Sequence, residues 1–190
     1  MKNFYRVKTD VILIRKVRRS KDDALFISML WRNRDVMKFV GFPEGIKESP
    51  ENIIRITKER IKKGAEHHLI IERKGKSIGE ALIRYDKKDK FAETDVKLLP
   101  KYQGRGYGIE VKRVLLIWIF KNTDARGVKA TPNVKNIASI RMQEGVGGKR
   151  IKRIRYEFPK NMSSFTIPVE SYLYIVYRRN WEKQKKQTPP

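Results

Sequence analysis

The sequence contains no cysteine and only two histidines, His67 and His68. The lack of cysteine excludes disulfides, thiolate metal sites and a cysteine nucleophile. The histidine pair has no third ligand at a suitable spacing, so we expect no metal ion. Long apolar runs are also missing: no window approaches the roughly 20 apolar residues that cross a bilayer, and the N-terminus lacks the apolar stretch of a signal peptide. We therefore expect a cytoplasmic protein.

Acidic residues are scarce relative to basic ones. The chain has 45 Lys and Arg against 21 Asp and Glu, which gives a formal net charge of +24. Such a charge attracts polyanions, with an affinity that falls as salt is added. It points either to an acidic partner such as RNA or to growth conditions that favour lysine-rich surfaces. The length of 190 residues fits one domain, which we place at 1–182, followed by a polar tail at 183–190 that we expect to be disordered.

Segment 149–155 has a higher density of basic residues than the chain as a whole. Five of its seven residues are cations, namely Lys149, Arg150, Lys152, Arg153 and Arg155. The alternation of Ile154, Tyr156 and Phe158 is typical of a strand. Two interpretations stay open: an edge strand protected from pairing by its charge, and a contact surface for RNA.

Residues 102–108, Tyr-Gln-Gly-Arg-Gly-Tyr-Gly, lead straight into an apolar helical pattern. Glycine permits positive φ and close approach of a ligand, so successive backbone N–H groups can converge on an anion at the helix N-terminus. Arg105 adds a full positive charge. A dinucleotide fingerprint would need glycine where Ile109 stands, and no Gly-Lys-Ser/Thr follows, so both common nucleotide loops are excluded. The loop predicts a pyrophosphate site of another kind.

The segments around this loop alternate between strand and helix patterns. Alternation predicts a strand over 91–98, and the helix over 106–120 must be buried because its second half is apolar nearly all round. A strand at 128–131 and a short helix at 136–145 follow, with Asn136 as the N-cap and Gly145 as the stop. Upstream, the pattern predicts two strands, at 67–72 and 78–83, joined by a turn.

The spacing from Gln103 to Gly108, Gln-x-x-Gly-x-Gly, resembles the pyrophosphate loop of the GNAT superfamily of acyl-CoA-dependent N-acetyltransferases. Asn136, Ser139 and Gly145 resemble the second signature of that superfamily. The resemblance extends over about 11–182. Residues 11–15 look like the first strand of the superfamily and 22–33 like its first helix. In the ribosomal-protein N-acetyltransferase branch, 35–41 is similar to the loop after that helix, and 174–181 to the last strand with its closing tryptophan.

This resemblance implies an α/β (α+β) fold: one domain with a mixed, mostly antiparallel sheet of six to seven strands, splayed central strands and about four helices. It implies an enzyme that transfers an acetyl group from acetyl-CoA directly to a primary amine, with a protein N-terminal amine, such as that of a ribosomal protein, as the expected acceptor. The alternative from a different class is a non-catalytic RNA- or ribosome-binding protein that keeps the fold. A homodimer stays open.

The resemblance also assigns candidate binding residues. The backbone of Val96, Lys97 and Leu98 would pair with the pantetheine arm, with one N–H facing the thioester oxygen. The remaining coenzyme candidates are Gln103, Gly104, Arg105, Gly106, Tyr107, Gly108, Asn136, Ser139 and Arg141, the last being either a phosphate contact or a surface arginine. Trp31, Met37 and Phe39 would line the acceptor pocket, although core packing explains them equally well.

A primary amine is mostly protonated at neutral pH, so acetyl transfer needs a base. Glu93 is the first candidate, because Phe91-Ala92-Glu93 is similar to the strand that carries the base in histone acetyltransferases of the superfamily. Asp95, about 7 Å further on the same face, is the second, and repulsion between two carboxylates would raise the pKa of one. A solvated sheet face is the alternative for both.

The proton donor for the leaving thiolate is left open by the sequence. Many members of the superfamily have a tyrosine on the second signature helix as general acid, and Met142 and Gln143 stand there instead. Water, Tyr107 and Tyr156 are the alternatives for this role.

Overall fold

The computed structural model describes residues 4, 6–62 and 66–187. Its centre is an eight-stranded sheet in the order β1-β2-β3-β4-β5-β6-β8-β7. The strands are β1 Arg6–Lys8, β2 Leu13–Lys16, β3 Glu66–Arg73, β4 Lys76–Asp86, β5 Phe91–Leu98, β6 Gly127–Ala130, β7 Lys149–Tyr156 and β8 Val169–Tyr177. The helices are α1 Lys21–Arg32, α2 Arg34–Met37, α3 Pro50–Lys62, α4 Tyr107–Asn122, α5 Ile137–Glu144 and α6 Arg178–Gln187.

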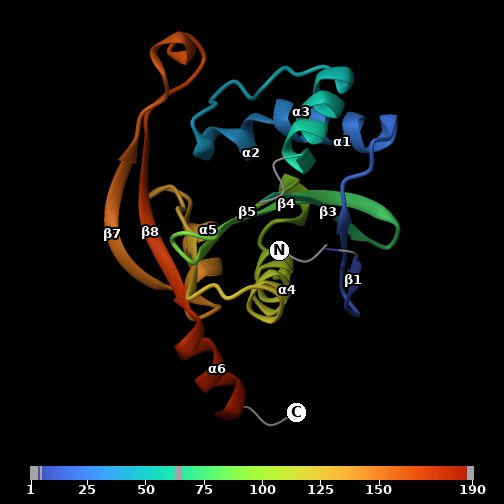
Figure 1. Cartoon of the computed structure of the whole chain (residues 1–190). Coiled ribbons are helices and arrows are strands. Elements are labelled where there is room, and N and C mark those ends of the chain that lie inside the picture. The colour runs from blue at the N-terminus through green and yellow to red at the C-terminus, as the bar shows by residue number, and fades with distance from the viewer. Residues whose placement is uncertain (1–3, 5, 63–65, 188–190) are drawn as a thin grey trace.

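Helices cover both faces of the sheet, with α1, α2 and α3 on one side and α4 on the other (Figure 1). The side chains of β5 alternate accordingly: Ala92 and Leu98 join the apolar core under α4, whereas Glu93, Asp95 and Lys97 point to the other face. The apolar residues of α1, α2 and α3 form a second core with Ile70 of β3. Each face of the sheet is therefore packed by its own set of helices.

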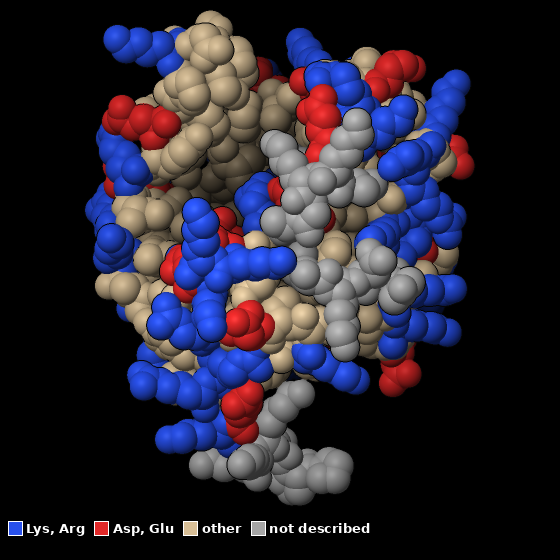
Figure 2. Space-filling view, in the orientation of Figure 1, with Lys and Arg blue, Asp and Glu red and all other residues tan. Residues whose placement is uncertain are grey.

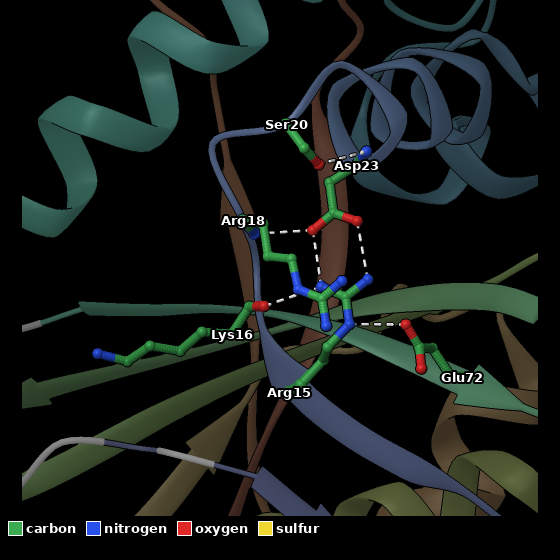
Figure 3. Close-up of polar contacts among 6 residues, drawn as sticks. All are labelled: Arg15, Lys16, Arg18, Ser20, Asp23 and Glu72. Atoms are coloured by element: carbon green, nitrogen blue, oxygen red, sulfur yellow. Dashed lines mark hydrogen bonds and ion pairs between the residues drawn. The ribbon is translucent and has the colours of Figure 1, made fainter. Parts of the chain in front are cut away.

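A buried ion pair fixes the start of α1 to the sheet (Figure 3). The Arg15 guanidinium donates to both carboxylate oxygens of Asp23, at 2.7 and 2.8 Å, and its Nε donates to Glu72 at 2.6 Å. Asp23 also accepts from the backbone N–H of Arg18 at 2.7 Å, and the side chain of Ser20 caps the helix. These contacts join β2, β3 and α1, so α1 is held at one angle to the sheet.

The two strands β5 and β6 diverge in the middle of the sheet. They pair in parallel at Phe91–Gly127, Ala92–Val128 and Glu93–Lys129, and β6 then ends at Ala130 while β5 runs on to Leu98. Pro132, which has no backbone N–H to donate, follows β6 closely. Among the described residues, no strand pairs with this edge of β5 from residue 94 to 98.

The β7–β8 hairpin extends past the sheet and meets the segment after α2 (Figure 1). The Ile167 N–H donates to the Gly41 carbonyl at 2.9 Å, and the Phe42 and Phe158 rings lie 5.2 Å apart. Gly41 has φ +93°, and a Cβ there would come within 2.3 Å of the Phe158 ring. Only glycine allows the hairpin to close over this segment.

The predicted fold class is confirmed, as is the order strand, glycine loop, helix, strand and helix from 91 to 145. The expected six to seven strands and four helices are corrected to eight strands and six α-helices among the described residues. Segment 35–41, expected as a loop, forms α2 and the 3₁₀ turn Lys38–Val40, because the Asn33 side chain caps the Val36 N–H. Strand β1 was not predicted, because its three residues are too few to show an alternating pattern.

The C-terminal end also differs from the expectation. The last strand ends at Tyr177, and Trp181 lies on α6 rather than on a strand. Arg178 ends the strand by donating to the carbonyls of Phe120, Thr123 and Ala125, at 2.7, 2.8 and 2.8 Å. Residues 183–187 of the tail belong to α6, and 188–190 lie outside the described residues. No helix in the described part of the chain is long and apolar enough to cross a membrane.

Candidate active site

A cavity of about 560 Å³ lies where β5 and β6 diverge. Its lining includes the consecutive residues 93–98 of β5, whose side chains point to alternate faces of the sheet. The cavity therefore reaches both faces. The other walls come from α2, the glycine loop, the first half of α4, the residues after β6, and α5. In Figure 2 the molecule is hollowed between the β7–β8 hairpin and α2, the region from which part of this lining comes.

The glycine loop forms one end of the cavity. Gly104 and Gly106 have φ of +68° and +80°, and no atom lies within 4 Å of the position that a Cβ would take at either residue. Gly106 is the N-cap of α4, whose first N–H groups have no partner within the helix. The Gln103 side chain donates to the Leu98 carbonyl at 2.8 Å and so ties the loop to β5. The space and the donors fit an anion such as a pyrophosphate.

Most of the predicted coenzyme residues line this cavity. They are Val96, Lys97, Leu98, Gln103, Gly104, Gly106, Gly108, Asn136, Ser139 and Arg141. Asn136 uses its Oδ1 to accept from the Ser139 N–H at 3.1 Å, which caps α5. Arg105 is exposed outside the lining, and Tyr107 is buried beside it, with the Arg73 guanidinium 5.1 Å from its ring. Tyr107 is therefore a core residue that supports the loop.

The two candidate bases occupy different environments on the same face. Both Glu93 and Asp95 line the cavity. Asp95 forms an ion pair with Lys97, whereas Glu93 is exposed and its carboxylate makes no hydrogen bond or ion pair with the residues that the structure describes. Arg84 and Lys129 stand beside Glu93 on the neighbouring strands. The Glu93 carboxylate is thus the more available of the two.

Behind Asp95 lies a buried polar network that the sequence did not reveal. The Glu80 carboxylate accepts from Trp31 Nε1 at 2.8 Å, contacts His68 Nε2 at 2.8 Å and lies 3.3 Å from Lys97 Nζ. Burial would raise the pKa of Glu80, but the positive charge of Lys97 and the two hydrogen bonds outweigh it and lower the pKa. Burial likewise opposes the charge of Lys97, whose pKa is raised by Asp95 and Glu80. The sequence feature that could have indicated this network is Glu80 itself, an acid within an apolar strand pattern, because a buried carboxylate requires polar partners.

This network explains why one predicted acceptor residue is absent from the cavity. Trp31 is held by Glu80 within the core, and Met37 is 3% exposed in the same core. Neither belongs to the cavity lining, and both pack in the apolar core. Phe39 does line it, together with Asp35, Val36 and Val40. This side of the cavity is therefore built by the short helix α2 and the turn after it.

Lys112 of α4 is a second site residue that the sequence did not single out. It lines the cavity on the α4 face, is 1% exposed, and its Nζ donates to Thr94 Oγ1. Burial lowers the pKa of Lys112 to about 7, with Asp95 acting in the opposite direction. The sequence feature that could have indicated this residue is a lysine at a position of α4 that the apolar pattern places towards the core.

The tyrosines considered as general acid do not reach the cavity. Tyr107 belongs to the core, and Tyr156 is 55% exposed on β7, where its ring packs on Phe158 at 4.9 Å. Met142 and Gln143 of α5 do line the cavity, and a Cβ on Gly108 would lie 3.1 Å from Met142 Sδ. Gly108 therefore allows α4 and α5 to pack closely here.

Segment 149–155 forms most of β7, the last strand at one edge of the sheet. Three of its cations are paired with acids: Arg150 with Glu144, Arg153 with Glu170, and Arg155 with Glu157 and Glu170. Cations are also spread over most of the face seen in Figure 2. Within the described residues, no group of three or more His, Cys, Asp or Glu is placed to hold a metal ion.

Comparisons with solved structures agree with this geometry. A spermidine N-acetyltransferase from Vibrio cholerae in complex with CoA and spermine superposes with a TM-score of 0.76 at 19% identity, over 91% of this chain and 99% of that chain. The ribosomal L7/L12 alpha-N-protein acetyltransferase RimL, in an apo form, gives a TM-score of 0.70 at 13% identity, over 89% and 91%. At these identities the likeness shows the fold. No curated protein matches the chain by sequence.

The family model for the acetyltransferase (GNAT) domain matches residues 12–149. This range contains the glycine loop, the diverging strands, α4 and α5, which are the parts that build the cavity. The expectation drawn from the two signatures is thereby confirmed. The chain belongs to the GNAT acetyltransferase family.

Proposed function

We propose that this protein uses acetyl-CoA to acetylate a primary amine directly, and that the amine is the N-terminus of a protein. One observation carries the proposal. A single cavity joins the glycine loop at the start of α4, the unpaired edge of β5 and the available carboxylate of Glu93. These three parts supply an anion cradle, an edge for an extended arm and a base.

On the coenzyme side, the chain offers backbone groups. The N–H groups at Gly104, Gly106 and the first turn of α4 would hold the pyrophosphate, and Arg141 lines the same cavity with an exposed cation. The unpaired edge of β5 from Leu98 back to Thr94 is about 13 Å long by strand geometry, and it would receive the pantetheine arm as an added strand. A backbone N–H near Val96 would stabilise the oxyanion that develops on the thioester carbonyl.

On the acceptor side, Glu93 would take the proton from the amine. Glu93 lies at the last paired position of β5 and β6, where the sheet opens and the cavity passes from one face to the other. A carboxylate there can reach an amine that enters from the α2 side, directly or through one water. Asp95 is committed to Lys97 and would keep that cation in place.

The charges around the cavity favour an acceptor with a single amine over a polyamine. Of the acids in the lining, Asp35 pairs with Lys38 and Asp95 with Lys97, while Arg84 and Lys129 flank Glu93. A polycation would need several unpaired acids, which the described lining does not supply. The net charge of +24 instead favours an amine presented on an acidic assembly, and Lys149 and Lys152 of β7, which pair with no acid among the described residues, would add to that attraction.

The test is an acetylation assay that follows release of the CoA thiol. Short peptides with a free N-terminus should be acetylated, and the same peptides blocked at the N-terminus but carrying an internal lysine should not. Spermidine serves as the competing acceptor. Turnover of spermidine with no turnover of peptides would refute the acceptor class, and the absence of turnover with every amine would favour the non-catalytic alternative.

A further inference from the structure

Lys112 occupies an unusual position for a lysine. Its neighbours on α4, Val111 and Val114, belong to the apolar core, and Lys112 itself is 1% exposed. An ammonium has three N–H donors, and within the described residues its one hydrogen bond is to Thr94 Oγ1. Burying an amine with so few partners costs free energy, so core packing alone does not account for a lysine here.

The place of Lys112 in the cavity gives it a reaction partner. It lies six residues after Gly106, about 9 Å along the helix axis. Thr94, which it contacts, is at the far end of the unpaired edge of β5 from the glycine loop. Glu93 is the next residue along β5 and points to the opposite face, because side chains alternate along a strand. Glu93 and Lys112 therefore both line the cavity, on opposite faces of the sheet and beside neighbouring residues of β5.

We infer that Lys112 is the general acid of the reaction and protonates the sulfur of the departing CoA. This inference rests on the proposed function. In the step, the C–N bond to the acceptor forms and the C–S bond breaks, with the electron pair going to sulfur. Glu93 takes one proton from the ammonium to give the neutral amine, a second proton leaves nitrogen to water as the amide forms, and Lys112 gives one from Nζ to sulfur. Exchange with solvent then restores both groups. No further reactant is needed.

The acidity of Lys112 suits this role. Its pKa of about 7 lies below the value of about 8.5 for an ordinary thiol, whereas an unperturbed lysine near 10.4 would hold its proton too tightly. The charged residues on the elements packed against α4 are Glu93, Asp95 and Lys97 of β5 and Arg141 and Glu144 of α5. Asp95 is the one that acts on Lys112, and it keeps the pKa from falling further.

Two substitutions separate proton donation from positive charge. Lys112→Met removes both, and Lys112→Arg keeps the charge but has a pKa too high to release a proton. We expect both variants to lower kcat roughly 100-fold, within the usual range for general acid–base catalysis, with CoA affinity by calorimetry changed less than about threefold. The parent should lose activity as the pH rises above the pKa of Lys112, and both variants should lack this descending limb. Arg113→Met, an exposed neighbour on α4, is the matched control.

A structural measurement keeps the inference independent of turnover. The folded pKa of Lys112 is about 7 against 10.5 for an ordinary lysine, so the unfolded chain binds more protons between these values and stability rises with pH there. Lys112→Met should therefore be more stable than the parent below pH 7, with the difference closing towards pH 10.5. Urea unfolding of both proteins at several pH values measures this.

Each outcome decides the question. Unchanged kcat in Lys112→Met, full activity in Lys112→Arg, or a descending limb that persists in either variant would overturn the assignment. Loss of stability in Lys112→Met below pH 7 would make Lys112 a structural residue. An intact mass showing acetylated Lys112 after incubation with acetyl-CoA would also overturn it, because an amide cannot donate the proton. If the parent acetylates no amine, the proposed function itself fails, which is a different result from equal activity in parent and variant.

Discussion

The Nζ atom of Lys97 lies 3.3 Å from Oε1 of Glu80 and also pairs with Asp95. It therefore joins a carboxylate buried in the core to one that lines the cavity. Trp31 and His68 hold Glu80 from the other side. Asp95 and Lys97 of the cavity lining are thus positioned by Glu80, Trp31 and His68, which do not belong to that lining.

We predict that Glu80→Gln destabilises the protein by about 3 kcal/mol, because removing one partner leaves a buried cation with incomplete compensation. Urea unfolding at pH 7 measures the change. Glu59→Gln is the control: Glu59 pairs with Arg55 on the exposed side of α3, and its loss should cost less than about 1 kcal/mol. Equal effects of the two substitutions would contradict a structural role for the network around Lys97.

A second prediction concerns the pair of Arg15 and Asp23 (Figure 3). Burial would raise the pKa of Asp23, but the hydrogen bonds from Arg15 and from the Arg18 backbone and the charge of Arg15 lower it below 3.8. A lowered folded pKa adds stability that is complete above the unfolded pKa and is lost as the pH falls through the folded one. Asp23→Asn should cost roughly 3–5 kcal/mol at pH 7, and progressively less as the pH falls through the lowered pKa of Asp23.

The check is urea unfolding of the parent and Asp23→Asn from pH 7 to pH 2. Asp22→Asn, exposed on the same first turn of α1, controls for the interaction with the helix dipole and should cost less than about 1 kcal/mol at any pH. A penalty for Asp23→Asn that does not shrink in acid would mean that the carboxylate charge is not what stabilises the start of α1.

The sequence predicted the secondary structure correctly where it depends on interactions between residues close together in the chain. The run from 91 to 145 was predicted correctly because its alternation, its glycines and the cap at Asn136 all act within a few residues. The network of Trp31, His68 and Glu80 joins segments that are 12 and 49 residues apart, so no local pattern contains it. Lys112 was missed because its burial depends on how α4 sits on β5, which periodicity does not specify.

A third prediction tests the glycine loop. Gly106→Asp places a carboxylate where the pyrophosphate should bind, so the rise in Tm that acetyl-CoA produces in the parent should largely disappear. Gly75→Asp is a close control, because Gly75 has φ +74° and open space at its Cβ, like Gly106 with φ +80°, but lies in the turn between β3 and β4. Both variants should lose similar stability without ligand. A full shift in Gly106→Asp would refute the assignment of the loop.

The last prediction concerns Glu93, the available carboxylate at the point where β5 and β6 separate. Glu93→Gln should lower kcat at neutral pH by ~10²–10⁴-fold and leave CoA affinity nearly unchanged, because a base acts on the amine and not on coenzyme binding. The loss should shrink as the pH rises and neutral amine becomes abundant. Asp35→Asn, which removes a paired acid from the same lining, should keep most of the activity. If Glu93→Gln keeps its turnover, the base is Asp95 or an ordered water, and if it loses CoA binding, Glu93 supports the structure of the cavity instead.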